Sequence, residues 1–292
     1  MSKIEDALKK ARSKASSLNG TPLDPEFPAP ATMESPVSGT SLDLYIESQR
    51  SIARMKEFKP LSAGELAEQR IVTPGMEVDG VSNAFREVRT KIVQAARGRN
   101  CSVLVTAVTP KAGCSFVALN LAVAFSLDET KTALLMDSDL ANPAFHNLHG
   151  PEDGPGLAEY LETDDLAAEK IIHPVGIHRL RLIPAGKTQN VRREHFTTVK
   201  MRHLLAEIAE RYPDRYLIMD APPILSCPEA RILADACDLA ILVVPYGKAT
   251  EAQIRNASQA IGPKKLFGVV FNDEPSLPSG LWRKSNGQHR AV

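Results

Sequence analysis

Five runs of apolar residues dominate the central part of the chain. They cover residues 101–105, 131–139, 215–223, 239–244 and 266–272, and the second and third carry acidic residues near their ends. Near-continuous apolar runs of this length are typical of parallel strands buried on both faces. The pattern therefore predicts a sheet of parallel strands.

Helical patterns lie between these runs. Residues 201–209 place Met201, Leu204, Leu205 and Ile208 at the 3.6-residue spacing of one helix face, residues 82–96 carry a similar apolar face ahead of the first strand, and residues 116–126 open another helix. Alternating strands and helices predict an α/β fold with a doubly wound, mostly parallel sheet, whose ligands bind at the carboxyl ends of the strands.

The segment from residue 106 to residue 115, T-A-V-T-P-K-A-G-C-S, has the context of a phosphate-binding loop because it joins a strand to a helix. Gly113 and Ser115 stand where this loop needs a glycine and a magnesium-binding hydroxyl. Val108 replaces the first glycine, and Cys114 replaces the lysine that reaches the β- and γ-phosphates. Lys111 is the remaining cation of the loop. Backbone N–H groups supply much of the phosphate contact, so we expect nucleotide binding to be separable from catalysis.

Three acids lie at the ends of two of the predicted strands: Asp137 and Asp139 at the end of the second, and Asp220 at the end of the third. The predicted topology brings them to the same crevice as the loop. Strand-end acids can also cap the turn at Asn142. Cys114 likewise has two interpretations, a reactive thiol at a helix N-terminus or a small neutral filler.

Five motifs in order carry a resemblance: P-K-A-G-C-S, L-L-M-D-S-D-L-A-N-P, I-P-A-G, Y-L-I-M-D-A-P-P and V-V-F-N. Over residues 61–273 the chain resembles the bacterial tyrosine kinases of polysaccharide export loci. The phrase A-E-R-Y-P-D-R-Y-L-I-M-D-A-P-P-I-L, followed by P-E-A-R-I-L-A, is similar to the exosortase-associated tyrosine autokinase branch. This resemblance implies a P-loop NTPase of the deviant Walker A type.

The resemblance also implies roles for single residues. Ser115 and Asp139 are expected to hold Mg²⁺, Asp137 and Asp139 to activate the attacking hydroxyl, and Asp220 to complete the acidic set. Asn272 matches a residue near the adenine. ATP or ADP with Mg²⁺ is the implied cofactor, and the other expected contacts come from the loop: Lys111, Ala112, Gly113, Cys114, Ser115 and Phe116.

Four departures from the family pattern predict a pseudokinase. Cys114 replaces the lysine, Ala141 replaces the arginine of D-x-D-x-R, and Asn83 replaces the first glutamate of an E-x-x-R-x-x-R helix used for subunit contacts, although Arg86 and Arg89 remain. The tail 273–292 contains no tyrosine, whereas relatives phosphorylate a C-terminal tyrosine cluster. Two alternatives remain: an active autokinase that uses Lys111, and a partitioning ATPase of the same superfamily.

The chain as a whole predicts a domain organisation, a location and a class of partner. The organisation expected is an N-terminal helix and mostly disordered linker over 1–80, a kinase-like domain over 81–273 and a disordered tail over 274–292. Lys plus Arg and Asp plus Glu both number 35, which argues against a nucleic-acid partner bound by bulk charge. Without an 18-residue apolar run or a signal core, the chain is expected in the cytoplasm, peripheral to the inner membrane. The resemblance implies an inner-membrane polysaccharide co-polymerase or chain-length protein as partner, or an active tyrosine kinase, or a second copy of the chain.

Overall fold

The computed structural model describes residues 60–72, 80–97, 99–129, 131–148, 154–187, 196, 199–212 and 215–273. The N-terminal helix and most of the linker expected over 1–80, and the tail expected over 274–292, lie outside the described residues. Within them the helices are α3 (Ala63–Glu68), α4 (Gly80–Ala95), α5 (Cys114–Ser126), α6 (Leu157–Glu162), η1 (Ala168–Ile171), α7 (Val199–Arg211), α8 (Pro228–Ala236) and α9 (Glu251–Ile261).

The described strands form one seven-stranded sheet in the order β3-β4-β2-β5-β1-β6-β7. All neighbouring pairs are parallel except β3 with β4. The strands are β1 (Ser102–Ala107), β2 (Thr132–Asp137), β3 (His173–Pro174), β4 (Leu180–Ile183), β5 (Arg215–Asp220), β6 (Leu239–Pro245) and β7 (Leu266–Asn272). The predicted doubly wound, mostly parallel sheet is confirmed.

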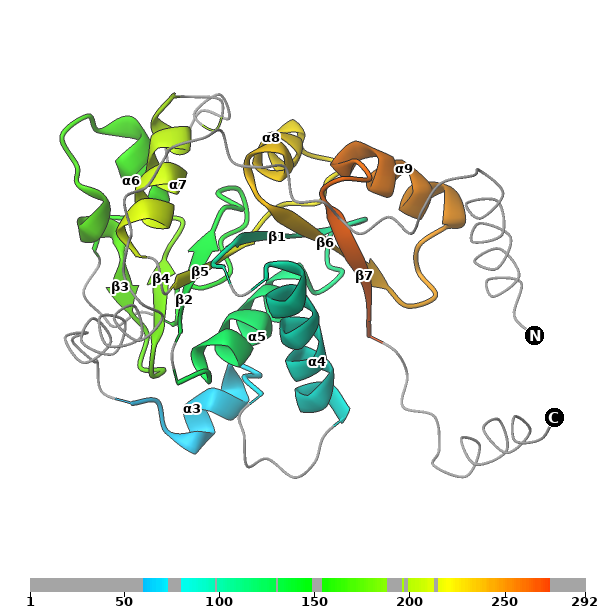
Figure 1. The fold of residues 1–292 in the computed structure, drawn as a ribbon, viewed down its shortest axis with the longest axis horizontal. Coiled ribbons are helices and arrows are strands. Elements are labelled where there is room, and N and C mark those ends of the chain that lie inside the picture. Colours follow the sequence, from blue (N-terminus) through cyan, green and yellow to red (C-terminus); the bar gives the residue numbers. More distant parts are fainter. Residues whose placement is uncertain are drawn as a thin grey trace. The chain divides into compact units, whose positions relative to one another are not determined.

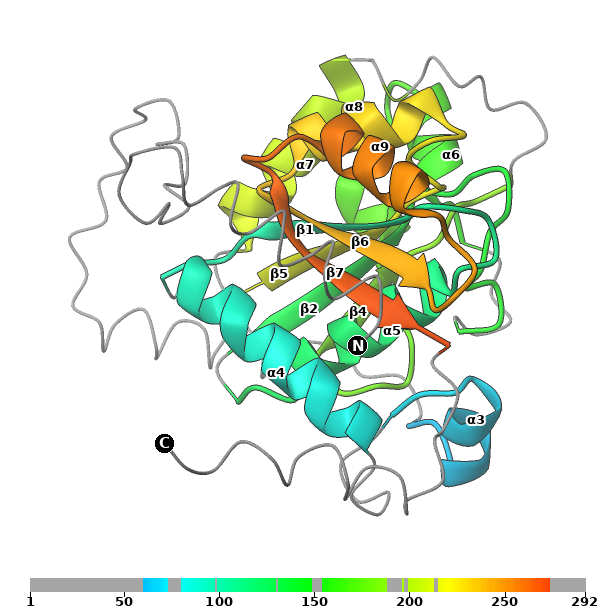
Figure 2. The ribbon, with the colours of Figure 1, turned by 90° about the vertical axis from the view of Figure 1, so that its right-hand side faces the viewer.

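Helices cover both faces of the sheet. Helices α4 and α5 lie on one face, and α6, α7, α8 and α9 lie on the other (Figure 1; Figure 2). Helix α5 is the buried centre of its layer, since every residue from Val117 to Ser126 is buried. It contacts β1, β2 and β5, so the loop at its start is held over the middle of the sheet.

Burial on both faces was predicted for all five apolar runs and is confirmed for β1, β2, β5 and β6. The prediction is wrong for β7, where Val269 and Phe271 are exposed. The reason is its position, because β7 is the last strand of the sheet and has a neighbour on only one side.

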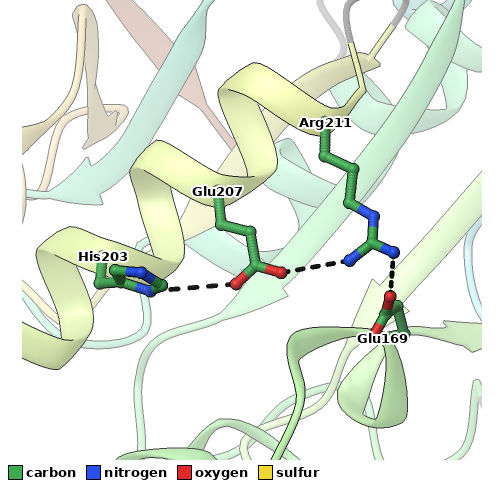
Figure 3. A network of polar contacts seen from close by, with 4 residues as sticks. All are labelled: Glu169, His203, Glu207 and Arg211. Carbon is green, nitrogen blue, oxygen red and sulfur yellow. Dashed lines mark hydrogen bonds and ion pairs between the residues drawn. The ribbon is translucent and has the colours of Figure 1, made fainter.

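The helix predicted over 201–209 is α7, and its buried residues are Met201, Leu204 and Ile208. One ion pair ties α7 to η1, between Arg211 and Glu169 (Figure 3). Within α7, Arg211 also contacts Glu207, and His203 lies on the other side of Glu207. Among the residues described, no helix is long and apolar enough to cross a bilayer.

Packed structure begins before the predicted domain boundary at residue 81. Ile71 is 1% exposed, and the Val72 N–H donates to Oδ1 of Asn120 at 2.7 Å. The amide nitrogen of Asn120 donates in turn to the Arg70 carbonyl at 3.2 Å. Asn120, on α5, therefore clamps residues 70–72 against the layer that carries the phosphate loop.

Candidate nucleotide site

The loop between β1 and α5 places its backbone at the carboxyl edge of the sheet. The Val108 N–H donates to the Val243 carbonyl of β6 at 3.0 Å, which fixes the start of the loop. Gly113 ends it with φ 83° and ψ 29°, a left-handed conformation that favours glycine. Among the described residues no side chain caps the helix here, so the first-turn N–H groups of α5 are available to an anion.

Cys114 is the first residue of α5, and its side chain turns inward. The thiol donates to the Val105 carbonyl at 3.2 Å and lies 3.5 Å from the Ala221 carbonyl. Burial raises the pKa of the Cys114 thiol well above its ordinary value, and the nearby Asp220 carboxyl raises it further. A raised pKa and the hydrogen bond to Val105 favour the neutral thiol, which supports the interpretation as a small filler over that of a reactive thiol.

Asp137 and Asp220 are direct neighbours, because they pair in register at the ends of β2 and β5. Both are 1% exposed. One oxygen of Asp137 accepts from the Ala144 N–H at 2.9 Å, while its Oδ1 and both oxygens of Asp220 have no hydrogen bond of normal geometry among the described residues. Buried acceptors of this kind are costly unless a proton or a cation satisfies them.

The pKa values of the two acids reflect this burial. Burial raises the pKa of Asp137 to about 8, and the charge of Asp220 adds to the rise. Burial raises the pKa of Asp220 to about 7, although Ser115 and Cys114 lie near enough to oppose the rise by hydrogen bonding. The Ser115 hydroxyl is thus brought beside Asp220, at the junction of the loop and the acids.

Asp139 is half-buried and lies close both to the turn at Asn142 and to the other acids. Its Oδ1 accepts from the Asn142 N–H at 3.1 Å, which is the turn-capping contact. Burial raises its pKa, and its charge also raises the pKa of Asp220, which places it in the same group of acids. Capping the turn therefore does not remove Asp139 from the site.

These residues fit a magnesium ion by their chemistry. A serine hydroxyl and carboxylates are hard oxygen ligands, and Mg²⁺ is commonly held by one or two carboxylates together with waters and phosphate oxygens. In the described part of the chain no three acidic, histidine or cysteine side chains are grouped to hold a metal by themselves. Ser115 and Asp139 remain the predicted protein ligands, with the rest of the shell supplied by a nucleotide and water.

The remaining predicted loop contacts differ in their surroundings. Ala112 is buried, and its carbonyl accepts from Nδ2 of Asn272 at 2.9 Å. Phe116 packs edge-on against Phe85 of α4, with ring centroids 5.9 Å apart, so it joins two helices. Lys111 is exposed and has a positive φ of 60°.

Arg89, one of the two arginines that match a subunit-contact motif, is used within the chain. Its guanidinium donates to the Ala124 carbonyl of α5 at 3.0 Å. Sequence reasoning also missed Asn120, whose only signal is a polar residue inside an otherwise apolar helix. Both residues fix α5, and through it the loop.

Two cavities of about 350 and 400 Å³ lie away from this crevice. They open beside α7 and α8, and Ser102, Arg215 and Asp238 at the amino ends of the strands line the larger one. The phosphate loop and the acids belong to the opposite edge of the sheet, where nucleotides bind in doubly wound folds.

The sheet order, the loop at the start of α5 and the acids on the adjoining strands define a P-loop α/β protein. Models of known protein families give no match to the chain. The tyrosine-protein kinase YwqD of Bacillus subtilis is 31% identical over 194 residues, which cover 65% of this chain and 80% of that protein. The chain therefore belongs to the bacterial tyrosine-protein kinase family.

Other relatives are longer than this chain. The tyrosine-protein kinase etk of Escherichia coli K12 is 28% identical over 197 residues, 66% of this chain but only 27% of that protein. The chain thus spans about a quarter of such relatives. Among solved structures, the kinase domain of Escherichia coli tyrosine kinase ETK matches 79% of this chain and 96% of that domain with a TM-score of 0.62 and 24% identity, which shows the fold.

Proposed function

We propose that this chain binds Mg²⁺ with ATP or ADP weakly, transfers no phosphate, and regulates exopolysaccharide biosynthesis, chain length or export by binding a partner. The observation that carries the proposal is the state of Cys114. Where the family motif has a lysine, this chain has a thiol with a raised pKa that donates a hydrogen bond to the Val105 carbonyl of β1. It offers no charge to a phosphate.

The missing charge is large in catalytic terms. A cation aimed at the transferring phosphoryl group is worth about 10³- to 10⁵-fold in rate in related enzymes. This chain lacks it at Cys114 and again at Ala141, where the family has an arginine. Lys111 is exposed, and its backbone conformation belongs to the turn of the loop.

A phosphotransfer assay tests the first part. Purified protein incubated with labelled ATP and Mg²⁺ should give no more labelled tyrosine than its Asp139→Asn variant. Labelling that depends on Asp139 would overturn the proposal, and its loss in Lys111→Ala would identify an active autokinase that uses Lys111. Cys114→Lys should tighten ATP binding, with activity remaining poor until Ala141→Arg is added.

Nucleotide binding is tested separately by calorimetry with Mg·ADP. When the metal and nucleotide are bound, they supply the positive charge and the phosphates that the crevice lacks. Ser115→Ala should weaken Mg·ADP binding because the metal loses a protein ligand. Ser126→Ala is a matched control, since that hydroxyl donates to the Val123 carbonyl at the far end of α5. Equal affinity in wild type and Ser115→Ala would refute a site that acts through Mg²⁺.

The proposed partner is an inner-membrane polysaccharide co-polymerase or chain-length protein, and it rests on the resemblance to the exosortase-associated autokinase branch. We expect the chain to be peripheral to the membrane through this partner. Fractionation of cells with and without the co-polymerase separates this from direct membrane binding by residues 1–17. Membrane association that survives deletion of the partner but is lost on removal of residues 1–17 would refute recruitment by the partner.

A further inference from the structure

Asn272, the last residue of β7, reaches across to the phosphate loop. Its own backbone is fixed, because it pairs in register with Pro245 and its carbonyl accepts from the Tyr246 N–H at 2.8 Å. From this position its side chain meets the Ala112 carbonyl at 2.9 Å. A carbonyl can only accept, so the facing atom is the amide nitrogen.

This contact sets the orientation of one peptide unit in the loop. In a trans peptide the C=O of Ala112 and the N–H of Gly113 point in opposite directions. Because the carbonyl is held by Asn272, the Gly113 N–H faces away from β7, and no described residue accepts from it. The left-handed φ of Gly113 is compatible with this arrangement, and a Cβ there would lie 2.1 Å from Nδ2 of Asn272.

We propose that Asn272 is a positioning residue that holds the phosphate loop in its binding conformation before the nucleotide arrives. The proposal rests on the proposed nucleotide site and differs from the role that the resemblance implies, a contact near the adenine. In a pre-set loop, the ordering of the Ala112–Gly113 peptide is done by the protein, and binding does not have to supply it. Asn272 then affects every ligand that carries phosphates, whatever its base.

The decisive variants are Asn272→Asp, which keeps the shape but sets a carboxylate against the Ala112 carbonyl, and Asn272→Ala, which removes the contact. Asp273→Asn is the matched control. It breaks the neighbouring ion pair with Lys248 and leaves the loop contact in place.

The first measurement is hydrogen exchange of the ligand-free protein. The N–H groups of Val108 and Val117, bonded to the carbonyls of Val243 and Gly113, flank the loop and report its opening. Both Asn272 variants should exchange about fivefold faster in peptides covering 108–117, as expected for one lost hydrogen bond of about 1 kcal/mol. Asp273→Asn should match wild type. Unchanged exchange in both Asn272 variants would overturn the proposal.

The second measurement compares Mg·ADP, Mg·GDP and magnesium pyrophosphate as ligands. A positioning role predicts that Asn272→Ala weakens all three by a similar factor. A loss confined to ADP would overturn the proposal in favour of an adenine contact. If the wild type binds none of the three, the proposed nucleotide function fails, and the exchange measurement alone still decides whether Asn272 holds the loop.

Discussion

Substitution of Gly113 by alanine tests how much stability the loop gains from having no side chain at this position. Gly113 has φ 83°, and an alanine in the left-handed region costs about 1–2 kcal/mol. The added Cβ also falls 2.1 Å from Nδ2 of Asn272, which is the end of a side chain and must move away. The displaced amide loses its bond to Ala112, which adds about 1 kcal/mol. Gly113→Ala should therefore destabilise the protein by about 2–3 kcal/mol.

Gly247→Ala separates the two contributions. Gly247 also has a positive φ, 67°, but nothing lies within 4 Å of its added Cβ. This variant should lose only the conformational part, about 1–2 kcal/mol. Urea denaturation gives both values from the free energy of unfolding extrapolated to water, provided that the m-values agree.

The double variant Gly113→Ala with Asn272→Ala completes the test. If the excess cost at Gly113 comes from displacing Asn272, removing Asn272 first leaves nothing further to displace. The two substitutions should then be less than additive, by about 1 kcal/mol. Strict additivity, or equal losses in Gly113→Ala and Gly247→Ala, would refute the reasoning.

Three other predictions follow from buried polar groups and ion pairs. The folded pKa values of Asp137 and Asp220, about 8 and 7, lie above the unfolded value near 4. The stability that these acids contribute is therefore fully present below pH of about 4 and is lost as pH rises to about 8. In urea denaturation, Asp220→Asn should be more stable than wild type at pH 8.5 but not at pH 4. A stability difference between variant and wild type that does not change with pH would contradict the raised pKa. Asn120→Leu should cost about 1–3 kcal/mol by leaving the Val72 N–H without its acceptor, and limited proteolysis should then cut residues 60–72 faster; unchanged cleavage would contradict the clamp. Arg211→Ala, which removes the half-exposed ion pairs of Figure 3, should change the unfolding free energy by less than about 1 kcal/mol, and that small loss should shrink in high salt; a larger, salt-independent loss would show that packing dominates there.

The core of the sheet was predictable because its strands are buried apolar runs that contrast with their surroundings. β4 was not predicted as a strand, since its four residues, L-R-L-I, include a charged one and form no long apolar run. The exposure of β7 was also not predictable from its own residues. It depends on strand order, which places β7 at the edge of the sheet.

The candidate site was also predictable from sequence only in part. Topology alone was enough to expect Asp137 and Asp220 beside the loop, because parallel strands end at a common edge. The thiol of Cys114 donates to the Val105 carbonyl only nine positions earlier in the chain, but the Ala221 carbonyl beside it lies 107 positions away. The contact between Asn272 and the loop spans 160 positions. Contacts over such separations leave no periodic signal in the sequence.

The hydrogen bonds of Asn120 show that residues 70–72, which precede the first motif, pack as part of the domain. A chain shortened to start at residue 81 would keep all five motifs but would lose Ile71, whose side chain is 1% exposed. It would also leave the buried amide of Asn120, in the helix that begins at the phosphate loop, without the backbone of Arg70 and Val72. A fragment that contains all five motifs is thus too short to fill the core and to pair the buried polar groups, which also need residues 70–72.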